Sequence, residues 1–112
     1  SARARTKPEG RLLIVRELDL GTLPAGGSME AVLSLKNPSP ETAYAARKLI
    51  ISSPGIAVEP AEFTIAPGAT LPLTFQITPD ATRNPGHATC DISGLTDTGD
   101  LLFRTTLSLK VK

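Results

Sequence analysis

The 112-residue sequence has one cysteine, no tryptophan, one histidine and only four aromatic residues. A single cysteine cannot form an intramolecular disulfide, so the fold depends on a hydrophobic core, which a chain of this length can supply. The lack of disulfides favours a cytoplasmic or cytoskeletal location over an extracellular one. No apolar run approaches the ~20 residues of a membrane-spanning helix. Apolar and charged residues occur in the ordinary proportions of a single globular domain.

Net charge is only +1, and it is unevenly distributed. Four basic residues and one acidic residue give residues 1–11 a charge of +3, so the rest of the chain sums to −2. A basic arm can contact nucleic acid or anionic lipid, but these charges have no interleaved aromatic residues. We therefore expect residues 1–10 to be a flexible basic lead-in to a single domain at 11–112, with neither nucleic acid nor membrane insertion involved.

Ten prolines and nine glycines divide the chain into short segments in which apolar side chains alternate with polar ones. This alternation is typical of half-buried strands. The predicted strands cover residues 11–18, 30–37, 43–52, 55–60, 62–68, 69–79, 87–95 and 101–112. The segment 43–52 would also permit a short helix, but the β-branched pair Ile50-Ile51 favours a strand. The sequence therefore predicts an all-β fold, an immunoglobulin-like antiparallel β-sandwich of seven to eight strands, monomeric in isolation.

Every second residue of a strand lies on the same face, and the apolar faces of these predicted strands define the expected core. The expected core residues are Leu33, Leu35, Leu73, Phe75, Ile77, Ile92, Leu107 and Leu109. Pro72 has no amide hydrogen, so residues 69–79 should form an edge strand, or Pro72 should lie near the start of the strand.

The stretch "LDLGTLPAGG" at 18–27 reads as the end of an early strand followed by a turn. Glycine gives the backbone freedom that the turn needs, and proline fixes one bend. We expect the chain to cross here to the second sheet.

Three residues are candidates for protein contacts: Leu13, Val15 and Tyr44. The predicted strand 11–18 is apolar on both faces, with Leu12 and Ile14 on one face and Leu13 and Val15 on the other. One face can enter the core, and the other needs cover from a partner, from a neighbouring domain or from local loops. Tyr44 either contacts a partner or covers the edge of the core.

The chain offers little for catalysis. His87 follows a turn at a strand start and should be exposed, whereas Cys90 should face the opposite side of that strand as a small core residue. Asp91, Asp97 and Asp100 lack the spacing of a calcium loop and suit a hairpin turn at 96–100. We expect no catalytic residue, no metal and no cofactor.

Two segments resemble a known family. "LDLGTLPAGGSMEAVLSLKNPSP" and "VEPAEFTIAPGATLPLTFQITP" are similar to the start and middle of the ASH domain (the ASPM, SPD-2, hydin type), which is related to the major sperm protein and PapD chaperone group. The resemblance spans roughly residues 12–112 and implies an immunoglobulin-like sandwich without catalytic residues. A second resemblance links "PGATLPLTFQITPDATRNPGHATCDISG" to the NEW3-type domains of bacterial and archaeal surface proteins and glycosidases.

The two resemblances imply different functions. The first implies a noncatalytic protein-interaction or scaffold module of a larger ciliary, centrosomal or cytoskeletal protein, which binds protein partners or adjacent domains. The alternative is an extracellular spacer or auxiliary domain of a bacterial surface protein or carbohydrate-active enzyme. Within that alternative the absence of tryptophan favours a spacer over a sugar binder.

Overall fold

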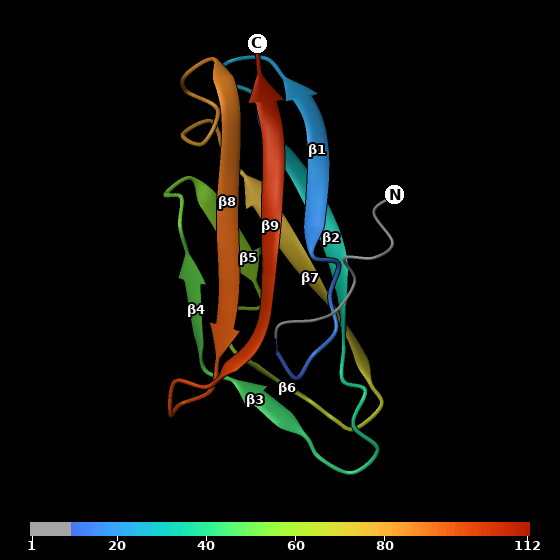
Figure 1. Cartoon of the computed structure of the whole chain (residues 1–112). Coiled ribbons are helices and arrows are strands. Elements are labelled where there is room, and N and C mark those ends of the chain that lie inside the picture. The colour runs from blue at the N-terminus through green and yellow to red at the C-terminus, as the bar shows by residue number, and fades with distance from the viewer. Residues whose placement is uncertain (1–9) are drawn as a thin grey trace.

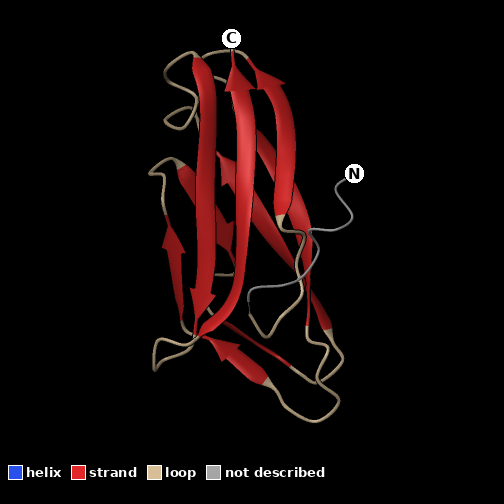
Figure 2. Ribbon diagram, in the orientation of Figure 1, coloured by secondary structure: helices blue, strands red, loops and turns tan. Residues whose placement is uncertain are grey.

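A computed structural model describes residues 10–112, so the predicted lead-in lies outside the described residues apart from Gly10. The described chain is built from strands joined by turns and contains no helix (Figures 1 and 2). No helix in this part is therefore long and apolar enough to cross a membrane. The strands are β1 (Glu17–Leu23), β2 (Met29–Lys36), β3 (Tyr44–Ala46), β4 (Lys48–Ile51), β5 (Ile56–Glu59), β6 (Phe63–Ile65), β7 (Thr70–Ile77), β8 (Gly86–Leu95) and β9 (Leu101–Val111).

The strands form two facing layers, so the predicted sandwich is confirmed (Figure 1). One sheet has the order β1-β9-β8-β4, and the other has the order β2-β7-β5. A short two-stranded sheet of β3 and β6 closes one end. All pairings are antiparallel except that of β1 with β9, which is parallel.

The prediction of seven to eight strands was one too few, because the predicted strand 43–52 is two strands. Ala46 is buried on β3, whereas Arg47 and Lys48 are both exposed, so the alternation breaks at Arg47. There the chain leaves β6 and joins β8, and the Arg47 amide donates to the Leu95 carbonyl at 2.9 Å. The segment therefore crosses from one sheet to another.

The predicted first strand at 11–18 was also misplaced. β1 begins only at Glu17 and continues through Gly21 to Leu23, well into the stretch 18–27 where the turn was expected. A bulge between Asp19 and Thr22 accommodates Gly21, whose φ is +86°. The turn itself follows β1, where the Gly27 amide donates to the Pro24 carbonyl at 2.9 Å.

The predicted core is confirmed, because all eight expected residues are buried. The core also contains Leu102 beside Phe103, which alternation excludes. A bulge explains the pair, since Leu95 and Gly94 oppose Leu101 and Phe103 and leave Leu102 as the extra residue.

Pro72 occupies a position where its lack of an amide hydrogen removes no hydrogen bond from the sheet. β7 is the central strand of its sheet, so the prediction of an edge strand was wrong. However, β5 pairs only as far as Thr74, and Pro72 is the third residue of β7. It therefore lies near a strand start, beyond the end of its neighbour on that side.

Candidate interaction surface

Residues 11–16 connect the two sheets along one side of the sandwich. The Leu12 amide donates to the Leu102 carbonyl on β9 at 2.8 Å, and its side chain is buried. The next residue, Leu13, pairs instead with Lys36 on β2 through two backbone hydrogen bonds of 2.8 and 2.9 Å. The chain then returns to β9, where the hydroxyl of buried Thr105 donates to the Val15 carbonyl at 2.7 Å. The backbone of this segment is thus fixed at both sheets.

The side chains of this segment follow the predicted parity. Leu12 is buried and Ile14 is half-buried against the core, whereas Leu13 and Val15 are 37% and 47% exposed. Large exposed apolar side chains held on a fixed backbone suit a protein contact, because little conformational entropy is left to lose on binding. Whether Leu13 and Val15 touch a partner stays a prediction.

Tyr44 lies at the end of the sandwich on β3, opposite Ile65 on β6. It is half-buried against the core, and the Arg11 guanidinium lies 5.9 Å from the centre of its ring. Arg11 and Tyr44 form a cation–π pair, and Arg11 directly precedes Leu12 and Leu13 in the chain. Much of the Tyr44 ring is therefore covered from within the chain, and its role as a contact residue also stays a prediction.

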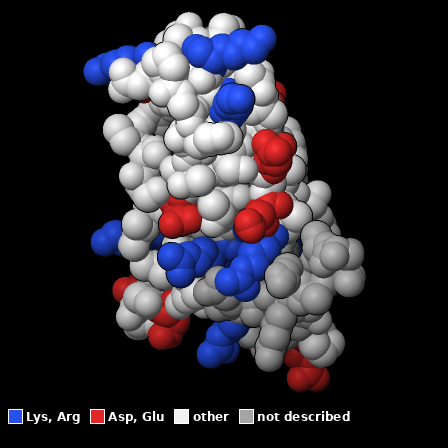
Figure 3. Space-filling model, turned by 45° about the horizontal axis from the view of Figure 1, so that its top comes forward, with Lys and Arg blue, Asp and Glu red and all other residues white. Residues whose placement is uncertain are grey.

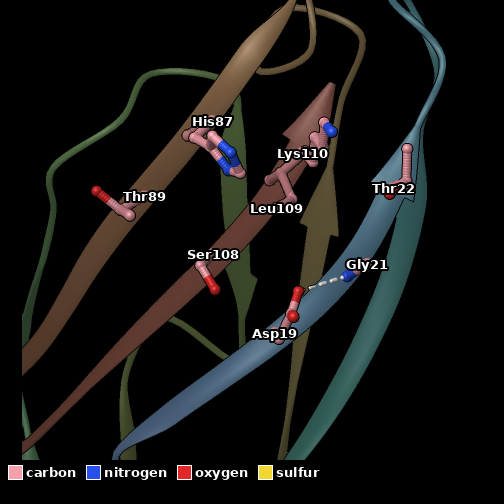
Figure 4. Close-up of a pocket in the computed structure, with 9 residues that line it drawn as sticks. Asp19, Gly21, Thr22, His87, Thr89, Ser108, Leu109 and Lys110 are labelled. Carbon is pink, nitrogen blue, oxygen red and sulfur yellow. Dashed lines mark hydrogen bonds between the residues drawn. The ribbon is translucent and has the colours of Figure 1, made fainter. Parts of the chain in front are cut away.

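A groove of about 260 Å³ crosses the outer face of β8, β9 and β1 (Figure 4). It is lined by Asp19, Gly21, Thr22, His87, Ala88, Thr89, Ser108, Leu109 and Lys110. The Asp19 carboxylate accepts the Gly21 amide at 2.8 Å, and His87 lies opposite Lys110 in the sheet register.

His87 is exposed on this groove and Cys90 is buried, as their parity predicts. Within residues 10–112 no hydrogen bond joins the His87 imidazole to a carboxylate or a hydroxyl. No cluster of metal-ligating side chains occurs within the described range.

Charges of both signs are interspersed on the face that Figure 3 shows. Basic side chains gather at the top of that view and again lower down, with acidic side chains between them. Among the residues that the structure describes, this face therefore carries no continuous basic stripe of the kind that follows a phosphate backbone.

Sequence reasoning missed one buried polar residue that organises the end of the sandwich near Tyr44. Asn37 is fully buried, and its Nδ2 donates toward the carbonyls of Thr42, Ile65 and Ala66 at 2.7, 3.1 and 3.2 Å. Its Oδ1 accepts the Ser39 amide at 2.9 Å. Asn37 therefore ties the turn after β2 to the turn after β6. The signal in the sequence was an asparagine directly before Pro38, at the end of the predicted strand 30–37.

Comparison with known proteins gives one family and several similar folds. The family model described as "Abnormal spindle-like microcephaly-assoc'd, ASPM-SPD-2-Hydin", abbreviated ASH, matches residues 14–93. No curated protein sequence matches the chain.

Three solved structures show the range of similar folds. A protein of unknown function from Porphyromonas gingivalis W83 is 19% identical with a TM-score of 0.73, and the match covers 90% of this chain and 46% of that one. The ASH/PapD-like domain 7 of human CEP192 is 14% identical with a TM-score of 0.60, over 96% and 89%. WR4, a Caenorhabditis elegans member of the MSP family, is 13% identical with a TM-score of 0.62, over 93% and 100%. The chain spans less than half of the first protein and most or all of the other two.

Proposed function

Because this chain belongs to the ASH family, we propose that it is a noncatalytic protein-interaction module of a larger ciliary, centrosomal or cytoskeletal scaffold. The family match supports an interaction module, and the family description itself names a spindle protein. The structural similarity to the CEP192 domain supports the same fold over nearly the whole chain.

One observation of this chain carries the proposal. Leu13 and Val15 are exposed on a segment whose neighbouring residues are bonded to both sheets. Burying such side chains against a partner removes apolar surface from water, at about 25 cal/mol per Å². We propose that Leu13 and Val15 contact the partner and that Tyr44, half-buried at the same end as Arg11, borders the contact.

Substitution by aspartate tests the proposal, because it leaves the backbone bonds of the segment in place. Leu13→Asp or Val15→Asp, made in the full-length protein, should reduce co-purification of its native partners at least ~10-fold, as expected for the loss of an interface anchor. Ile50→Asp is the matched control. Ile50 is 48% exposed on β4, at the edge of the four-stranded sheet opposite to β1.

Far-UV circular dichroism of the isolated domain should show that all three variants fold. The proposal fails if folded Leu13→Asp and Val15→Asp retain the same partners as the Ile50→Asp control.

A further inference from the structure

Within residues 10–112, the edge of β2 that faces away from β7 is almost entirely without a strand partner. β7 pairs with all eight residues of β2 without a register shift. On the other side, within residues 10–112, only Leu13 pairs with β2, and it does so at Lys36. Leu13 thus begins an antiparallel strand on this edge, but the chain then leaves for β9, where the Arg16 carbonyl accepts the Thr106 amide.

Because the chain leaves β2 after Leu13, other backbone groups on this edge have no strand partner within residues 10–112. The alternation of the strand identifies them. The amide and carbonyl of Lys36 both point outward, since both bond to Leu13. Every second residue of a strand points its backbone groups to the same side, so those of Glu30, Val32 and Ser34 also point outward. Pro72 is consistent with this assignment for Ser34. The two residues lie opposite each other, and Pro72 has no amide hydrogen to donate to Ser34.

The other edges of the two larger sheets are short or interrupted, whereas β2, which also carries the charged residues Glu30 and Lys36, is neither. β1 carries Glu17 and Asp19 and is interrupted by a bulge at Gly21. β4 and β5 have four residues each; β4 begins with a lysine, and β5 is followed by Pro60. Short strands, charges, bulges and prolines are the usual devices that prevent strand addition at an edge.

β2 instead runs for eight residues in unbroken register with β7 and has an apolar side chain at its centre. Val32 is 56% exposed, the largest fraction among the exposed large apolar residues of the described chain. Paired residues project their side chains to the same face of a sheet, so exposed Leu13 lies on the same outer face as Lys36, Ser34 and Val32.

We propose that the edge of β2 from Glu30 to Ser34 binds an extended segment of a partner protein as an added antiparallel strand. This inference rests on the proposed function and names how that function is carried out. The antiparallel direction follows from Leu13, because the added segment continues the strand that Leu13 begins. Its N-terminal end abuts Leu13, which prevents it from extending to Lys36.

The side chains along the edge define the chemistry of the segment. An apolar residue opposite Val32 is buried against an apolar side chain, and a basic residue opposite Glu30 meets a carboxylate. A small polar residue fits opposite Ser34. Read from N to C, the segment has a small polar residue, any residue, an apolar residue, any residue, and then a basic residue.

A peptide with this pattern tests the proposal by amide hydrogen exchange. The probe is the heptapeptide TTVVTRT with blocked ends, titrated into the isolated domain. In the free protein the outward amides of Glu30, Val32 and Ser34 should exchange fast, whereas those of Ala31 and Leu33 are already protected by β7. Saturating peptide should slow the three outward amides at least ~10-fold and leave the other two unchanged.

Matched variants separate this edge from the rest of the surface. Val32→Lys places a charge at the centre of the edge and should abolish the protection, whereas Ile50→Lys on β4 should leave it unchanged. The peptide TTVVTET should bind about 2–5-fold more weakly than TTVVTRT. Glu30→Lys should reverse the order of the two peptides.

Three results would overturn the proposal. They are no protection of the outward amides, protection that survives Val32→Lys, and protection that rises with protein concentration without peptide, which would assign the edge to a second copy of the chain. The proposed function stands or falls separately. It survives a failed peptide titration if Leu13→Asp still removes native partners, and it fails if neither Leu13→Asp nor Val15→Asp removes them.

Discussion

Replacing Asn37 by alanine should remove the cross-link between the turn after β2 and the turn after β6. The amide group makes four contacts: Nδ2 toward three carbonyls at 2.7–3.2 Å, and Oδ1 with the Ser39 amide at 2.9 Å. Nδ2 has only two hydrogens, so these contacts amount to about three hydrogen bonds with a net value of ~1 kcal/mol each. The backbone bonds of Asn37 with Gly68 and Ala69 remain in the variant. We expect the free energy of unfolding to fall by about 2–4 kcal/mol.

Urea denaturation followed by far-UV circular dichroism measures this loss, since the chain has no tryptophan for fluorescence. The midpoint should shift while the slope m stays unchanged, because the folded state keeps its compactness. Asn84→Ala is the matched control: Asn84 is the other asparagine of the chain and is exposed. A loss below about 1 kcal/mol for Asn37→Ala, or an equal loss for the control, would refute the view that the buried amide stabilises this end.

Asn37→Asp sharpens the same prediction. The substitution keeps the acceptor for Ser39 but places a carboxylate against three carbonyl oxygens. This environment favours the neutral acid, so the pKa of the new carboxyl should be raised in the folded state. Stability relative to the natural chain should therefore fall as pH rises through the pKa of the unfolded chain, and equal losses at acidic and neutral pH would contradict the argument.

Three further predictions concern the core. A Cβ on Gly94 would lie 2.1 Å from the ring of Phe103, so Gly94→Ala should destabilise the fold by about 1–3 kcal/mol in a urea melt, and an unchanged midpoint would show that the ring moves freely. Leu73→Ala should lower the free energy of unfolding by about 2–5 kcal/mol, because Leu73 is fully buried. Thr74→Ala should lower it by less than about 1 kcal/mol, because the neighbouring Thr74 is only half-buried, and equal losses for the two variants would contradict the register. Buried Cys90 should react with a thiol reagent only in denaturant, and rapid labelling of the native protein would contradict its burial.

The alternation of side chains in the sequence determined which residues face the core. Leu73, Phe75 and Ile77 are buried because they share one side of a single strand, and Leu13 and Val15 are exposed because they lie opposite Leu12 and Ile14. This information is local, since the direction of a side chain is set by its own strand. Glycine and proline likewise marked the turns because they act through their own backbone angles.

Only the tertiary structure decided which strands pair and where the chain changes sheets. The crossing at Arg47, the parallel pairing of β1 with β9 and the departure of the chain from β2 after Leu13 all depend on backbone hydrogen bonds. Backbone amides and carbonyls are the same in every residue except proline, so side-chain patterns carry little information about the partner that they find. The sequence accordingly predicted that Leu13 and Val15 share the face opposite Leu12 and Ile14, but the exposure of that face and the open edge of β2 beside it emerged only from the folded chain.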